Sequence, residues 1–268
     1  MNIILITTIS ITVIGILVGA GLVFTGKKFY VETNEREAAV RAALPGNNCG
    51  ACGYAGCDAM AAAGDRGEAP VNGCPVGGAA VTEQLGAIMG VQAAPPERIV
   101  AFVKCKGNHD VTTNQGSYIG PADCRSAALS GLAISSCDYG CFGLGSCAAV
   151  CEQNAIRIVN GVAVVDTARC VACGLCVKVC PRGLIELIPE HCTVGVQCSN
   201  REKGPLVKKV CSAGCIGCTL CVRECESHAI TVMDNIAKVN YDACTQCGKC
   251  VEKCPAKVIT PPAGQRKA

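Results

Sequence analysis

The chain has 268 residues, of which 25 are cysteine and 31 are glycine, while aromatic residues make up 3% and tryptophan is absent. This composition excludes a large aromatic core and favours a fold held together by disulfides or metals. The formal charge at pH 7 is +3. Because there is no basic stripe with interleaved aromatic residues, the charge gives no support to nucleic-acid binding.

The first expected element is a membrane-spanning helix. Residues Ile3–Phe24 carry no charge, and such a run can cross a hydrocarbon core of about 30 Å as a helix. Lys27 and Lys28 follow, and the positive-inside rule then leaves the downstream chain in the cytoplasm. A cleaved signal peptide is the alternative, but its charged start and small-residue cleavage site are missing. We therefore expect residues 1–26 to form a single-pass anchor in the cell membrane.

A compact cysteine module is expected next, over residues 27–90. Its thiols follow the spacing C-x2-C-x4-C-x16-C and are those of Cys49, Cys52, Cys57 and Cys74. Nearby glycines would let backbone amides approach the sulfur atoms. The spacing predicts a four-iron, four-sulfur ([4Fe-4S]) cluster, with zinc as the alternative. A connecting segment is expected over residues 91–133, with a boundary at Pro95-Pro96.

The rest of the chain contains an internal repeat, in which residues 141–188 can be laid over residues 215–262. In each copy two short apolar runs flank a turn dipeptide such as Asn160-Gly161, and this pattern predicts a β-hairpin. Short helices are expected after the cysteine loops. The expected boundaries are 134–190 for the first repeated domain, 191–210 for a connecting segment and 211–268 for the second repeated domain.

Each repeat carries the cysteine run C-x2-C-x2-C-x3-C of bacterial ferredoxins. Three thiolates of such a run bind one cluster, and the fourth binds the neighbouring cluster. Three sets follow: Cys151, Cys170, Cys173 and Cys176; Cys215, Cys218, Cys221 and Cys254; and Cys225, Cys244, Cys247 and Cys250. The expected fold class is therefore α+β, with one N-terminal transmembrane helix, a small helical and loop [4Fe-4S] domain and two bacterial-type 2×[4Fe-4S] ferredoxin-like domains.

One further site departs from the pattern, because Leu144 stands where the other copy has Cys218. Cys137 is the expected replacement, and the resulting set is Cys137, Cys141, Cys147 and Cys180. A three-iron cluster without a fourth thiolate is the alternative. The expected total is five clusters, which would change the net charge from +3 to roughly −7, at about −2 for each cluster with its thiolates.

Five cysteines remain after these sets: Cys105, Cys124, Cys192, Cys198 and Cys211. The spacing C-x12-C-x3-C begins at both Cys124 and Cys198, which assigns these residues to the duplication. Two interpretations stay open for the remaining thiols. They could be structural and redox-inert, or Cys105, Cys124, Cys192 and Cys198 could hold a sixth cluster.

The uncharged N-terminal run, the Asn48–Tyr54 motif and the Cys137–Gly145 and Cys211–Cys218 segments closely resemble the B subunits of Rnf complexes, in their longer form. The resemblance implies a component of an ion-transporting ferredoxin:NAD⁺ oxidoreductase. It would take electrons from soluble reduced ferredoxin and pass them through its [4Fe-4S] clusters to membrane partners.

The same resemblance implies that the flavins, the nicotinamide site and the path for Na⁺ or H⁺ belong to other subunits. We therefore expect no catalytic side chain, flavin or nucleotide in this chain. Glu152 and Glu226 are departures, since bacterial ferredoxins usually have proline at these positions. The alternatives are a membrane-bound polyferredoxin adaptor of another dehydrogenase or hydrogenase, without ion pumping, and a zinc-rich structural protein.

Overall fold

The computed structural model describes residues 2–28, 34–94, 97–113, 118–131, 134–192 and 194–260. For residues 2–4, 6–8, 10 and 26–28 it describes only the backbone. The boundary expected at Pro95-Pro96 lies outside the described residues.

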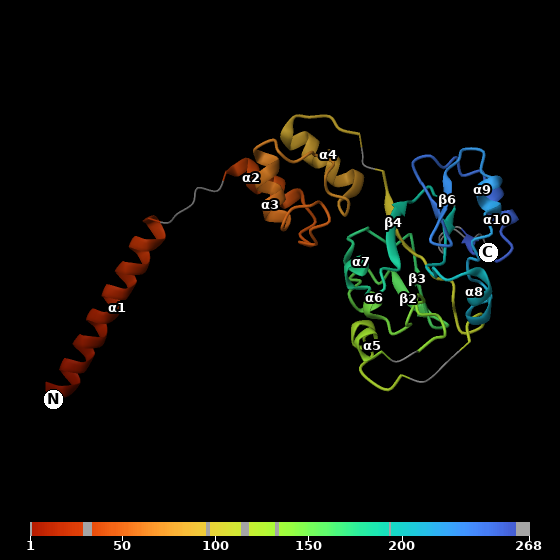
Figure 1. Ribbon diagram of the computed structural model, residues 1–268. Coiled ribbons are helices and arrows are strands. Elements are labelled where there is room, and N and C mark those ends of the chain that lie inside the picture. The colour runs from red at the N-terminus through yellow and green to blue at the C-terminus, as the bar shows by residue number, and fades with distance from the viewer. Residues whose placement is uncertain are drawn as a thin grey trace.

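The first element is helix α1 (Asn2–Lys28), which extends away from the rest of the molecule in Figure 1. Within the part of the chain that is described, no helix has the length and apolar content needed to cross a membrane. The span expected over Ile3–Phe24 is therefore not confirmed and remains a prediction.

Three helices form an N-terminal module: α2 (Glu35–Ala43), α3 (Cys57–Asp65) and α4 (Gly78–Met89). The side chain of Asn34 caps α2 by accepting a hydrogen bond from Arg36 N at 3.1 Å. The helices pack around buried Val40, Met60 and Leu85. This small core holds the loops that carry the first cysteines.

Two β-hairpins repeat in the rest of the chain. Strand β2 (Ile156–Val159) pairs antiparallel with β3 (Val162–Val165), and β6 (Ile230–Met233) pairs antiparallel with β7 (Ile236–Val239). The turn residue Asn160 has φ 48° and Gly161 has φ 80°, as a type I′ turn requires. The hairpin expected from this dipeptide is therefore present.

A second strand pair closes each half of the repeat and joins segments that are far apart in the sequence. Strand β1 (Ile99–Val103) pairs with β4 (Ile185–Pro189), and β5 (Gly195–Val196) pairs with β8 (Ile259–Thr260), both antiparallel. We call β1 to β4 the first half and β5 to β8 the second half. Both β1 and β5 lie in segments that were expected to be connectors.

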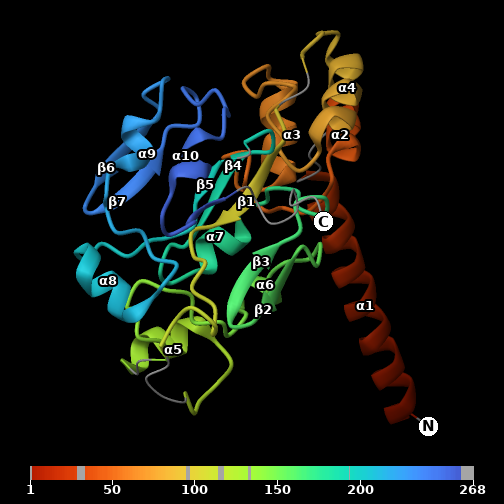
Figure 2. The same cartoon turned by 90° about the vertical axis from the view of Figure 1, so that its right-hand side faces the viewer.

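The described part of the two halves also contains six short helices. They are α5 (Cys124–Ser130), α6 (Ser146–Ala149), α7 (Leu175–Val179), α8 (Gly204–Val210), α9 (Leu220–Arg223) and α10 (Lys249–Lys253). In Figures 1 and 2 hairpin β2–β3 lies below the β1–β4 pair, whereas hairpin β6–β7 lies beside it. Equivalent residues are buried in both halves, for example Ile156 and Ile230, so the duplication extends to the core.

Candidate iron–sulfur sites

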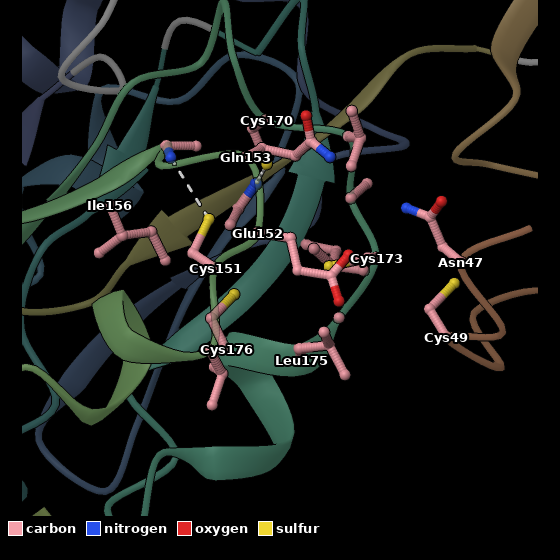
Figure 3. A pocket seen from close by; sticks show the side chains of 17 residues that line it. Asn47, Cys49, Cys151, Glu152, Gln153, Ile156, Cys170, Cys173, Leu175 and Cys176 are labelled. Atoms are coloured by element: carbon pink, nitrogen blue, oxygen red, sulfur yellow. Dashed lines mark hydrogen bonds between the residues drawn. The ribbon is translucent and has the colours of Figure 1, made fainter. Parts of the chain in front are cut away.

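A cavity beside α7 brings together four thiols that the sequence predicts as one set. It is lined by Cys151, Cys170, Cys173 and Cys176, and Figure 3 shows these side chains around it. Ala101 N donates a hydrogen bond to Cys170 Sγ at 3.3 Å. Ala155 N donates one to Cys151 Sγ, also at 3.3 Å. Such amide donors stabilise thiolates, which are the ligand form that a cluster requires.

Burial opposes the thiolate form in this cavity. It raises the pKa of Cys176 to about 12, and neighbouring Cys170 and Cys173 act in the same direction. Without a metal the thiol therefore keeps its proton near neutral pH. A bound cation would reverse that balance, because coordination deprotonates thiols.

The N-terminal module reaches the same cavity. Asn47 and Cys49 line it from the loop before α3, and Lys178 Nζ in α7 donates a hydrogen bond to Cys49 O at 3.4 Å. The first cysteine of the module therefore faces the Cys151 set directly.

The other three cysteines of the module lie together. Cys52 and Cys57 pack against the core that contains buried Cys74. Burial raises the pKa of Cys74, and the nearby thiols of Cys52 and Cys57 add to this rise. Gly77 N donates a hydrogen bond to Cys74 Sγ at 3.4 Å, so one sulfur of this set has an amide donor.

The second half brings its predicted thiols close to one another. Burial raises the pKa of Cys221 to about 11, and Cys215, Cys218 and Cys254 contribute to the rise. Burial also raises the pKa of Cys250 to about 11, with contributions from Cys244, Cys221, Cys225 and Cys247. Because Cys221 of one predicted set contributes to the raised pKa of Cys250 in the other, the two sets are neighbours.

The divergent set of the first half differs from the expectation. The cavity beside Phe142 is lined by Cys124, Cys141, Cys147 and Cys180, whereas Cys137 does not line it. Thus Cys124, at the start of α5, supplies the thiol that Leu144 cannot.

A short hydrogen-bond network fixes the start of α5. Ser146 Oγ accepts a hydrogen bond from Cys124 N at 2.7 Å and donates one to Asp123 Oδ1 at 2.8 Å. Ser126 N donates to Asp123 Oδ2 at 2.8 Å, and these donors lower the pKa of Asp123 to about 2. Since Ser146 directly precedes Cys147, the network ties α5 to the cysteine loop of the same cavity.

The sixth set that the sequence left open is not brought together either. Cys105 and Cys198 share a cavity, but the other thiols that line it are those of Cys137 and Cys211. Cys192 is fully buried elsewhere, in a core cluster with Phe102 and Ile188.

The spacing C-x12-C-x3-C misled the sequence interpretation, because it equates Cys124 with Cys198. In the fold, Cys198 follows β5 as Cys105 follows β1. The first half has a longer segment between its strand and Cys137, and this insertion carries α5. The sequence feature that could have identified Cys105 as the equivalent of Cys198 is the apolar run Ile99–Val103, which precedes Cys105.

Among the described residues, no group of three or more His, Cys, Asp or Glu side chains meets the arrangement of a metal-ion site. Three groups of four thiols instead surround cavities. Each thiolate around a cubane binds a different iron, so its ligands need not meet at one point. Four thiols with amide donors to sulfur therefore fit a [4Fe-4S] cluster in their donor chemistry.

Three family models match the chain, and all of them describe iron–sulfur domains. They are a putative Fe-S cluster domain over residues 44–76, a 4Fe-4S binding domain over residues 163–186 and a 4Fe-4S dicluster domain over residues 214–265. The matches lie in the N-terminal module, the first half and the second half, so iron–sulfur chemistry is assigned to all three parts.

Curated relatives cover almost the whole chain. The B subunit of the Na(+)-translocating ferredoxin:NAD(+) oxidoreductase complex of Acetobacterium woodii is 42% identical over 97% of this chain and 78% of its own length. The B subunit of an ion-translocating oxidoreductase complex of Methanosarcina acetivorans is 40% identical over 97% of this chain and 99% of its own length. The B subunit of a proton-translocating ferredoxin:NAD(+) oxidoreductase complex of Clostridium ljungdahlii is 38% identical over 91% and 87%, respectively. The resemblance drawn from the motifs is thereby confirmed, and the chain belongs to the family of B subunits of the Rnf ion-translocating oxidoreductase complexes.

Proposed function

We propose that this chain is the electron-relay component of a membrane complex that oxidises reduced ferredoxin and reduces NAD⁺, coupled to the translocation of Na⁺ or H⁺. The names of its relatives support the reaction. The observation that carries the relay role is that Cys49 of the N-terminal module lines the same cavity as Cys151, Cys170, Cys173 and Cys176 of the first half.

Five [4Fe-4S] clusters are part of this proposal. Their ligand sets are Cys49, Cys52, Cys57 and Cys74; Cys124, Cys141, Cys147 and Cys180; Cys151, Cys170, Cys173 and Cys176; Cys215, Cys218, Cys221 and Cys254; and Cys225, Cys244, Cys247 and Cys250. When bound, the clusters supply one-electron redox chemistry. The protein contributes the thiolates, the amide donors to sulfur and an environment with little water.

The proposed direction of flow runs from the second half to the membrane. Soluble ferredoxin docks on the ferredoxin-like halves, and electrons cross them toward the Cys151 set. The N-terminal module accepts the electrons there, because Lys178 holds the Cys49 loop against α7. Other subunits of the complex supply the flavins, the nicotinamide site and the ion path.

Helix α1 is proposed as a single-pass anchor in the cell membrane. The uncharged run Ile3–Phe24 supports a span, and Lys27 and Lys28 favour a cytoplasmic location for the cluster domains. An anchor would keep the N-terminal module next to the intramembrane partners that receive its electrons.

Rapid mixing tests the relay. The full chain, purified and reconstituted without oxygen, is mixed with reduced ferredoxin, and bleaching of its visible absorption is followed with and without NAD⁺. We expect fast bleaching and no NADH from the chain alone, whereas membranes that hold the whole complex should produce NADH. Failure to bleach, or NADH formation by the isolated chain, would contradict the proposal.

A further inference from the structure

We propose that Cys105, Cys137, Cys198 and Cys211 bind an additional [4Fe-4S] cluster between the two ferredoxin-like halves. The inference rests on the proposed function for its cluster chemistry, but not for its ligands. This set differs from the sixth set that the sequence suggested, and it uses two thiols from each half.

The four thiols surround one cavity, which we call the junction cavity. Three of them, Cys105, Cys137 and Cys211, are buried. A Cβ atom placed on Gly107 would lie 3.6 Å from Cys105 Sγ and 3.7 Å from Cys211 Sγ, so these sulfurs approach the same glycine from different segments. The Cys137 thiol contributes to the raised pKa values of the other three cysteines, which places it near each of them.

The junction cavity follows from the duplication of the fold. In the first half Lys104 N, just before Cys105, donates a hydrogen bond to Leu184 O at 2.7 Å. In the second half Gln197 N, just before Cys198, donates one to Val258 O at 2.9 Å. These equivalent bonds fix the two cysteines at equivalent places.

The other two thiols are equivalent as well. Cys137 and Cys211 each stand four residues before the first cysteine of a ferredoxin loop, Cys141 and Cys215. Each half therefore offers the same pair of thiols, and the docking of the halves completes a set of four.

Backbone contacts hold the halves together at this cavity. Thr112 forms a β-bridge with Cys211. Thr113 N donates a hydrogen bond to Val210 O at 3.3 Å, and Ser212 N donates one to Val111 O at 2.9 Å. Cys211 is therefore fixed against the first half by its own backbone and that of its neighbours.

Polar donors point at the sulfur atoms of the junction cavity. Cys141 N donates to Cys105 Sγ at 3.4 Å, Cys215 N donates to Cys198 Sγ at 3.3 Å, and Asn200 Nδ2 donates to Cys137 Sγ at 3.5 Å. Such donors stabilise thiolates and the anionic cluster that they hold. Hydrogen-bond donors of this kind are expected around thiolates that bind a cluster. A buried thiol that only fills space does not need them.

The same bonds connect the junction cavity to a proposed cluster on either side. Cys141 belongs to the set beside Phe142, and Cys215 belongs to a set in the second half. A cluster in the junction cavity would therefore bridge the halves and provide the link that electrons need to cross between them.

The iron content of the full chain tests this inference. We expect about 24 irons per anaerobically prepared chain, and about 20 in the double variant Cys137→Ser/Cys211→Ser, since a cubane contains four irons. The matched control is Cys192→Ala, which removes a buried thiol outside the junction cavity and should keep about 24. Circular dichroism and the EPR signals of the remaining clusters show whether the double variant is folded.

Two outcomes would overturn the additional cluster. One is a wild-type chain with about 20 irons and five EPR-active clusters, and the other is zinc in place of the additional iron. The wild-type count decides the question even if the double variant does not fold. Bleaching by reduced ferredoxin tests the relay independently, so a failed relay and a missing cluster are distinguishable.

Discussion

The two ferredoxin-like halves share a fold but build one equivalent site differently. In the second half, Cys215, Cys218 and Cys221 follow the regular loop spacing. In the first half Leu144 interrupts that loop, and Cys124 reaches the cavity from the inserted helix α5. The comparison teaches that a thiol can reach such a cavity from a segment outside the regular cysteine loop.

Removal of iron should give the largest effect and should act on both halves alike. Each half has a small core that includes several cysteines, and structural metal binding contributes on the order of 10 kcal/mol to the folding of small thiolate-bound domains such as zinc fingers. We expect anaerobic chelation to unfold both halves, as measured by circular dichroism and limited proteolysis. If one half stayed resistant to protease, the halves would differ in how they are stabilised.

Cys124→Ser should match Cys218→Ser if the two residues are equivalent ligands. Each variant is expected to lose at least one iron at its own site and to form a three-iron cluster with an EPR signal in the oxidised state. Cys124→Ser/Leu144→Cys should then recover the lost iron, because it restores the regular loop. No loss of iron from Cys124→Ser would refute the assignment of Cys124.

Arg182 offers a sharper comparison, because the equivalent residue in the second half is Ala256. The guanidinium carbon of Arg182 lies 3.8 Å from the centroid of the Phe142 ring, and its Nη1 atom donates to Cys137 O at 3.1 Å. A cation favours the more negative, reduced cluster. Arg182→Gln should therefore lower the reduction potential of the proposed cluster beside Phe142, which Cys141 helps to bind, by tens of millivolts.

An EPR-monitored redox titration measures this shift. The internal controls are the two proposed clusters of the second half, one bound by the set that contains Cys218 and the other by the set that contains Cys247. An equal shift at all sites would show that Arg182 does not act locally.

Lys178 should give the smallest effect. Its counterpart in the second half is Glu252, and its Nζ contacts Cys49 O through an exposed hydrogen bond at 3.4 Å. Lys178→Glu should slow electron transfer into the N-terminal module a few-fold, because one exposed contact contributes only about 1 kcal/mol. Stopped-flow bleaching of that module's cluster measures the rate, and Lys253→Glu is the control for a change of surface charge.

Local patterns allowed much of this molecule to be predicted. The turn at Asn160-Gly161 identifies its hairpin, since both residues adopt the positive φ that the dipeptide favours. The regular runs at Cys170 and Cys244 likewise predict neighbouring thiols, because their spacing is set within a single loop. These features depend on residues that are close in the sequence.

Features that depend on distant segments could not be predicted in the same way. Strand β1 is short and finds its partner at Ile185–Pro189 only in the folded chain. The same long-range pairing positions Cys105. Cys124 is positioned by the inserted segment that carries α5, and the sequence does not indicate how that segment folds back on the first half. Spacing alone equated Cys124 with Cys198, although only the strand pairing identifies the true equivalent.

The late position of β8 in the sequence has a consequence for biosynthesis. Strand β5 has its partner at Ile259–Thr260, so this strand pair cannot form until residue 260 has been synthesised. Until then Cys198, which follows β5, lacks the pairing that positions it, including the hydrogen bond from Gln197 N to Val258 O. The proposed junction cluster draws thiols from both halves, so its ligand set is complete only after the β5–β8 pair has formed.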